Sequence, residues 1–155
     1  RVGVIGTKAT INSKAYEREL LQIDPSIKVT ASACPLFVPL VEEGWLKERA
    51  VYDVVKHYLK PLKEASVDTL ILGCTHYPIL KAVIKEVMGN KVALIDSAKQ
   101  AAYEVKQTLS DQGLLESSRR PLRKFYVSDN PAWFKELAER FLGQEVTNVK
   151  KVNNV

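Results

Sequence analysis

Short apolar runs rich in β-branched residues alternate along this chain with longer segments whose apolar residues recur every three or four positions. This alternation is typical of a parallel β-sheet whose faces are covered by helices. The strands are expected at residues 2–6, 28–33, 69–73, 91–96, 124–128 and 145–149. The predicted fold class is therefore α/β, with a parallel sheet and helices on both faces.

Helical periodicity is found over about 47–62, 78–88, 97–112 and 131–141. Pro61 is expected to kink or end the first of these helices. Gly89 and Gly113 are suited to end the second and third. Asp129 or Asn130 can cap the fourth, which is expected to bury the apolar residues Phe134, Leu137, Ala138 and Phe141.

The composition is that of a globular protein, and 155 residues are enough for about one domain. A net charge of +5 favours anionic partners but is too small to indicate nucleic-acid binding. No apolar run approaches the roughly 18 residues of a membrane-spanning helix, so no membrane partner is expected. Two cysteines and the lack of a secretory leader pattern predict free thiols in the cytoplasm.

The segment Leu70–Pro78 is the strongest candidate for a functional site. It places Cys74 between the end of a predicted strand and the start of a predicted helix, where open α/β sheets bind ligands. A helix N-terminus and the nearby His76 would both favour the thiolate, and free N–H groups there can hold a carboxylate. The alternative is that Cys74 is a small buried apolar residue, although Gly73 before it and Thr75 after it are poor core material.

Other candidate residues have simpler interpretations. Thr7 and Thr10 follow the first strand and can either cap a short helix or bind a carboxylate, and spacing alone favours the cap. Cys34 lies in an apolar stretch that enters a short helix and is interpreted as buried structure. His57 is expected on the exposed flank of its helix. Positions 34, 57, 74 and 76 lack paired ligand spacing, so no metal site is predicted.

The polar and basic stretch 116–124, which includes Arg119, Arg120 and Arg123, is expected to be a loop. A solvated connection is the favoured interpretation, and an anion-binding site is the alternative.

Three of these segments together resemble the glutamate racemase family of the aspartate/glutamate racemase superfamily. They are Val2–Thr7 with Thr10, the stretch from Ala33 through Pro39 to Glu42, and Leu72–Pro78. Relatives that act on aspartate typically carry an acidic residue where this chain has His76, so the resemblance implies glutamate as the substrate. It also implies an isomerase that needs no cofactor and supplies D-glutamate for peptidoglycan, the cell wall and cell shape.

The resemblance assigns roles to particular residues. Inversion at the α-carbon needs one base to remove the proton from one face and one acid to return a proton to the other. By resemblance Cys74 is the thiol that deprotonates L-glutamate, His76 assists that proton transfer, and Glu42 is the partner of the histidine. Thr7, Thr10, Thr75 and His76 match positions that hold the substrate.

The chain departs from the family pattern in one large respect. The Asp-Ser-Gly and Ala-Cys-Asn-Thr segments of the family's N-terminal portion do not occur, and Cys34 is followed by Pro35 instead of Asn-Thr. We therefore expect a C-terminal fragment that is inactive alone. Residues 1–96 would form most of the second domain, and residues 97–155 would pack on the missing N-terminal domain. A homodimer is possible on this pattern.

Two alternatives remain at this point. One is a racemase or decarboxylase of the same superfamily that acts on another small acid. The other is a non-catalytic anion-binding or interaction module, suggested by the net charge and the basic stretch 116–124.

Overall fold

The computed structural model describes residues 1–116 and 122–152. These group into two compact units, Arg1–Asp111 and Gln112–Val155, and each is described by itself. The expected division at residues 96 and 97 falls at the junction of a strand and a helix within the first unit. The central residues of the basic stretch 116–124, including Arg119 and Arg120, lie outside the described residues.

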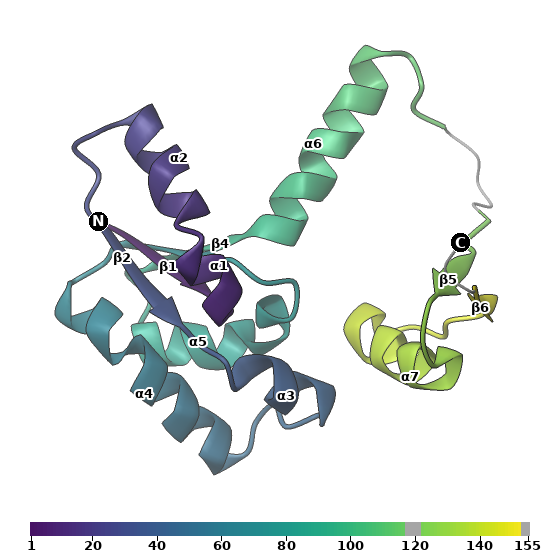
Figure 1. Ribbon diagram of the computed structural model, residues 1–155, viewed down its shortest axis with the longest axis horizontal. Helices are drawn as coiled ribbons and strands as arrows, with labels where there is room; N and C mark the ends of the chain where they lie inside the picture. Colours follow the sequence, from purple (N-terminus) through teal and green to yellow (C-terminus); the bar gives the residue numbers. More distant parts are fainter. Residues whose placement is uncertain (117–121, 153–155) are drawn as a thin grey trace. The chain divides into compact units, whose positions relative to one another are not determined.

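The first unit is built on a four-stranded parallel sheet (Figure 1). Its strands are β1 (Val2–Gly6), β2 (Val29–Ala33), β3 (Thr69–Leu72) and β4 (Ala93–Asp96), in the order β2-β1-β3-β4. All four were expected within two residues of these bounds. The predicted α/β class with a parallel sheet is therefore confirmed.

Helices lie on both faces of this sheet. One side is covered by α4 (Arg49–Glu64) and α5 (Lys81–Met88), which pack side by side (Figure 1). The short α1 (Lys8–Asn12) and α2 (Ala15–Ile23) lie over the other side, against β1 and β2. The remaining helices of this unit are α3 (Phe37–Glu42), the 3-10 helix η1 (Tyr77–Leu80) and α6 (Ser97–Asp111).

The core of this unit lies between the sheet and α4 with α5. Its fully buried side chains come from alternate strand positions such as Ile5 and Leu70 and from the apolar stripes of the two helices. Tyr52 of α4 donates a hydrogen bond to the Glu86 carboxylate of α5 at 3.0 Å, which adds a polar link at the edge of this packing. None of the residues of α2 or α6 is buried in the described structure.

Helix α4 does not end at Pro61, which was one of the two expected effects of this residue, but continues to Glu64. Pro61 has no N–H to donate to the preceding turn, which normally ends a helix. Here Pro61 lies on the exposed side of α4, while Leu59 and Leu62 on either side of it are fully buried. Burial of the flanking leucines therefore keeps the last turn helical.

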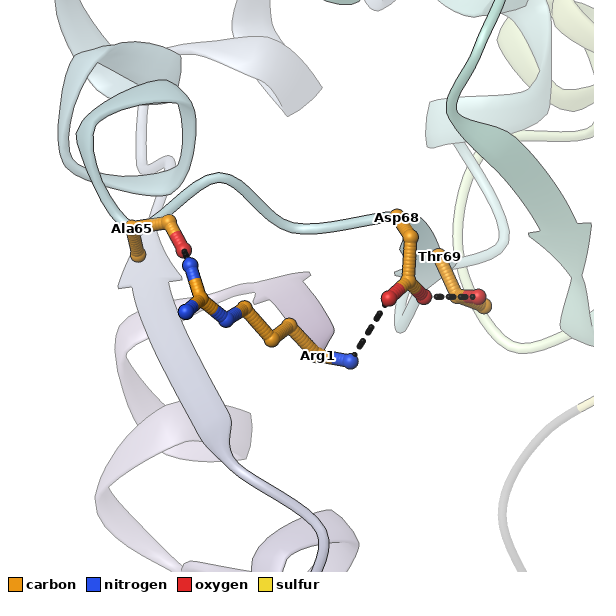
Figure 2. Close-up of polar contacts among 4 residues, drawn as sticks. All are labelled: Arg1, Ala65, Asp68 and Thr69. Carbon is orange, nitrogen blue, oxygen red and sulfur yellow. Dashed lines mark hydrogen bonds and ion pairs between the residues drawn. The ribbon is translucent and has the colours of Figure 1, made fainter.

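Contacts at the first residue fix the start of β1 against the loop that leads into β3 (Figure 2). The Arg1 guanidinium donates to the Ala65 carbonyl at 3.2 Å, and the Arg1 carbonyl accepts from the Asp68 N–H at 3.0 Å. The Asp68 carboxylate accepts from the Arg1 α-amino group and from the Thr69 hydroxyl, both at 2.8 Å. These bonds agree with the register that pairs Val2 with Thr69.

The second unit contains a βαβ arrangement. Strands β5 (Phe125–Val127) and β6 (Val149–Lys151) pair in parallel, and α7 (Pro131–Leu142) connects them. The four apolar residues of α7 that were expected to be buried are only half-buried, because a two-stranded sheet covers little of the helix.

Strand β6 begins four residues later than expected. Val146 lies inside the predicted strand 145–149 and is buried, but it precedes the residues of β6 that pair with β5. Its N–H donates to the Glu139 carboxylate at 3.0 Å. Asn148 has a φ of 60°, a left-handed conformation that interrupts an extended chain. Strand pairing therefore starts only at Val149.

No helix among residues 1–116 and 122–152 is both long and apolar enough to cross a membrane.

Candidate active site

The candidate site lies at the carboxyl ends of β1 and β3, the two central strands. Ile5 pairs with Leu72 at the ends of these strands, and the Gly73 N–H donates to the Ile5 carbonyl at 2.8 Å. In the order β2-β1-β3-β4, the connections run to opposite sides from this pair. Such a switch point is where open α/β sheets bind ligands. Thr7 and Cys74 follow these two strand ends.

Cys74, His76 and Glu42 come together in one line of contacts. The Cys74 Sγ lies 4.0 Å from His76 Nδ1, and His76 Nε2 lies 3.1 Å from Glu42 Oε1. The histidine and glutamate side chains are 21% and 28% exposed, so the pair is shielded but reachable. An imidazole between a thiol and a carboxylate can pass a proton from one to the other. The catalytic roles expected of the three residues remain predictions.

The turn after Cys74 differs from the expected helix start. The Tyr77 N–H donates to the Cys74 carbonyl at 3.2 Å and opens the 3-10 helix η1, whereas α5 begins only at Lys81. The macrodipole effect expected at Cys74 requires an α-helix directly after it. The four-residue 3-10 helix η1 offers a weaker dipole at this position.

Thr7 and Thr10 adopt the cap that their spacing favoured. Thr7 Oγ1 accepts from the Thr10 N–H at 3.2 Å, and the two hydroxyl oxygens are 3.0 Å apart. Thr7 is therefore the N-cap of α1. Both side chains are half-buried beside the end of β1, and their expected contact with a substrate stays a prediction. Thr75 is exposed, with Oγ1 3.4 Å from His76 Nδ1.

Cys34 is structural, as predicted. Its side chain is fully buried at the end of β2, and its Sγ donates weakly to the Ser32 carbonyl at 3.7 Å. Burial raises the pKa of the Cys34 thiol to about 12, so this group stays protonated at neutral pH. His57 is exposed on α4, which confirms the expectation of a surface residue.

Several residues around the site were not found from the sequence. The Ser97 hydroxyl donates to the Leu72 carbonyl at 2.8 Å and lies 3.5 Å from the Tyr16 hydroxyl. Tyr16 and Ser97 thus support the end of β3 from α2 and α6. Their spacing of 81 residues gives no local signal. Tyr77 belongs to the motif that carries Cys74, but nothing in that motif reveals its partner.

Within residues 1–116 and 122–152, no group of three or more His, Cys, Asp or Glu side chains has an arrangement that could hold a metal ion.

Curated relatives match this chain along nearly its whole length. It is 47% identical to the glutamate racemase of Geobacter metallireducens over 154 residues, which are 99% of this chain and 57% of that protein. It is 49% identical to the glutamate racemase of Corynebacterium diphtheriae over 152 residues, again 57% of the relative. The chain thus spans somewhat more than half the length of these relatives.

Solved structures agree with the sequence relatives. A glutamate racemase isoform from Bacillus anthracis and the Francisella tularensis glutamate racemase in complex with D-glutamate each give a TM-score of 0.91 at 39% identity. Each match covers 98% of this chain and 57% of the other. The family model described as Asp/Glu/Hydantoin racemase matches residues 1–105. The resemblance read from the sequence motifs is confirmed, and the chain belongs to the Asp/Glu/Hydantoin racemase family.

Proposed function

We propose that this chain supplies one side of the active site of a cofactor-independent glutamate racemase, with Cys74 as its acid–base group. The observation that carries the proposal is the line of contacts from the Cys74 thiol through His76 to Glu42 at the switch point of the sheet. The relatives named as glutamate racemases support glutamate as the substrate.

The proposed reaction consists of two proton transfers. The Cys74 thiolate takes the α-proton of L-glutamate, and the electron pair of the broken C–H bond stays on the α-carbon, stabilised by the adjacent carboxylate. A second acid on the opposite face then donates a proton to that carbon, which gives D-glutamate. His76 accepts the proton from Cys74, and the Glu42 carboxylate stabilises the imidazolium that results. In the reverse direction Cys74 donates.

We expect the second acid to come from polypeptide outside these 155 residues. Cys34 is the other cysteine of the chain, and it is buried with a pKa raised to about 12 by that burial. It therefore has neither access to a substrate nor a readily formed thiolate. We expect that the chain alone does not racemise glutamate.

The threonines beside Cys74 are proposed to hold the substrate. Thr7, Thr10 and Thr75 carry hydroxyls that can donate to carboxylates or accept from an amino group. Thr7 and Thr10 lie after β1, which pairs with β3, the strand that precedes Cys74. The proposed product, D-glutamate, would serve peptidoglycan synthesis in the cytoplasm, and a homodimer is a compatible assembly.

A chimera tests this proposal. This chain replaces the matching 57% of the Geobacter metallireducens racemase, and circular dichroism at a wavelength where the glutamate enantiomers differ follows racemisation. We expect racemisation by the chimera and none by the isolated chain. Cys74→Ala should abolish the activity, whereas Cys34→Ala, the matched removal of the other thiol, should retain it. Full activity in the Cys74→Ala chimera would exclude the proposed role.

A second candidate is racemisation of another small acid, because the matching family also includes enzymes described as acting on aspartate and hydantoin. The same chimera can be incubated in D₂O with glutamate, aspartate and a hydantoin, and α-proton exchange measured by NMR. Exchange confined to a substrate other than glutamate would favour this candidate.

A further inference from the structure

Tyr77 joins the two segments that carry His76 and Glu42. Its side chain is fully buried, and its hydroxyl donates to the Cys34 carbonyl at 3.0 Å. Its own N–H donates to the Cys74 carbonyl at 3.2 Å. Tyr77 therefore forms hydrogen bonds both with the backbone of residues 73–76, which we call the Cys74 loop, and with the backbone that leads into α3.

The Cys34 carbonyl also receives the first N–H of α3. Phe37, the first residue of that helix, donates to the same oxygen at 3.1 Å. The Phe37 and Tyr77 rings meet edge to face, with centroids 5.1 Å apart and planes at 73°. The Tyr77 phenol thus fixes the position of the start of α3 through one shared acceptor and one ring contact.

Glu42 is the last residue of α3, which is only six residues long. A rigid helix of that length transmits a movement of its first turn to its last residue. His76 is the other member of the pair, and its position depends on Tyr77 because the two residues are adjacent in the chain. The 3.1 Å separation of His76 Nε2 and Glu42 Oε1 therefore spans the two segments that Tyr77 joins.

The phenol of Tyr77 is suited to be a permanent donor. Burial, and to a lesser extent the nearby Cys34 and Cys74 thiols, raise its pKa above the ordinary value. The hydroxyl consequently keeps its proton at neutral pH. The oxygen it binds is a backbone carbonyl, which cannot rotate away without moving α3.

We propose that Tyr77 is a positioning residue that sets the geometry of the His76–Glu42 pair by holding α3 against the Cys74 loop. The catalytic consequence rests on the proposed racemase function, whereas the effect on His76 does not.

The first test uses NMR on the 155-residue chain and needs no activity. The chain has two histidines, so a long-range ¹H–¹⁵N spectrum contains two imidazoles, and the exposed His57 is an internal reference. Tyr77→Phe keeps the ring and removes the hydroxyl. We expect it to move the His76 resonances in the direction produced by Glu42→Gln. The matched control is Tyr52→Phe, which removes one tyrosine hydrogen bond between α4 and α5 and should leave His76 unchanged.

The second test is a double-mutant cycle in the chimeric racemase. Loss of one neutral hydrogen bond should reduce kcat about 2- to 10-fold in Tyr77→Phe. KM for glutamate should stay unchanged, because the Tyr77 side chain is fully buried. Adding Tyr77→Phe to Glu42→Gln should cause no further loss, since the pair it positions is already broken.

The outcomes separate the two proposals. Unmoved His76 resonances in a folded Tyr77→Phe chain, or additive effects in the cycle, would overturn the positioning role. If the isolated variant does not fold, the cycle in the chimera decides. An inactive chimera together with moved His76 resonances would refute the racemase function and leave the positioning role supported.

Discussion

Gly73 is the residue on which the placement of Cys74 depends most directly. A Cβ at this position would lie 2.8 Å from the Ile5 carbonyl oxygen and 3.0 Å from Cε2 of Tyr16. The first of these atoms is backbone of the neighbouring strand and the second belongs to a packed ring. The chain can pass from β3 to Cys74 along this path only because position 73 lacks a side chain.

Gly73→Ala should therefore destabilise the first unit and displace Cys74. The expected loss in free energy of unfolding is about 1–3 kcal/mol, the usual cost of forcing an extra methyl group into a packed site, measured by urea denaturation. Gly3→Ala is the matched control. Its Cβ would also be crowded, at 2.9 Å and 3.0 Å, but by the ends of the Leu62 and Leu70 side chains, which can shift. Equal destabilisation by the two substitutions would contradict this account.

Predictions about single residues were confirmed where the structural role of the residue depends on its neighbours in the sequence. The spacing of Thr7 and Thr10 predicted the cap, and the apolar surroundings of Cys34 predicted its burial. The contact of Glu42 with His76 followed only from family resemblance, because the two residues are 34 positions apart. Tyr77 shows why the rest was missed, since its partner is a backbone carbonyl 43 residues away. No local pattern encodes a bond to a distant carbonyl.

At the level of whole elements, α7 has an N-terminal cap formed by a side chain. The Asn130 Oδ1 accepts from the N–H groups of Ala132 at 2.9 Å and Trp133 at 3.3 Å, and Pro131 occupies the first helical position. Two of the four N–H groups that a helix start leaves without an intrahelical partner are thereby satisfied, and proline lacks a third. The sequence offered Asp129 and Asn130 as caps, and the structure uses Asn130.

Asn130→Ala should destabilise the second unit by about 1 kcal/mol, the typical value for loss of such a cap. Hydrogen exchange at the amides of Ala132 and Trp133 reports the effect locally and should become faster. Asp129→Ala, one residue earlier, is the matched control and should leave this exchange nearly unchanged. Similar acceleration in both variants would show that the Asn130 hydrogen bonds are not what protects these amides.

Element types were predicted better than element ends. The strands of the first unit were found because alternation with amphipathic helices is a strong signal over many residues. The end of α4 was misplaced because the prediction considered only the hydrogen bond that proline cannot donate. It did not take into account that Leu62, the next residue, is fully buried. The start of β6 was misplaced because the amino-acid sequence around Asn148 is typical of a strand and does not reveal the left-handed backbone conformation of this residue.

For the molecule as a whole, the two units differ in how much they bury. Almost all fully buried side chains belong to Arg1–Asp111, whereas Val146 is the buried residue of the second unit within its described part. The periodicity predicted a sheet and its helices. Helix α6 buries none of its residues, and its packing on a missing N-terminal domain, expected from the family resemblance, stays a prediction. The measured stability of the chain should accordingly reflect mainly the first unit.

The stability of that unit should decrease in alkaline solution, with Cys34 as one specific cause. Burial raises the pKa of Cys34 from 9.0 to about 12. Above pH 9 the unfolded chain therefore loses this proton while the folded chain retains it, so a rise in pH favours unfolding. Each pH unit between about 9 and 12 should lower the free energy of unfolding by up to about 1.4 kcal/mol through this group. Below pH 9 Cys34 contributes no pH dependence.

The measurement is a series of urea denaturation curves between pH 8 and pH 11 for the unmodified chain and for Cys34→Ala. The variant loses some packing at every pH, but its stability should decline less steeply above pH 9, so the two curves converge as pH rises. Tyr77, whose pKa burial also raises, remains in both proteins and its contribution cancels in the comparison. The control Cys74→Ala keeps Cys34 and should retain the steeper decline. Parallel declines in the unmodified chain and Cys34→Ala would mean that solvent reaches the Cys34 thiol in the folded protein, against its complete burial.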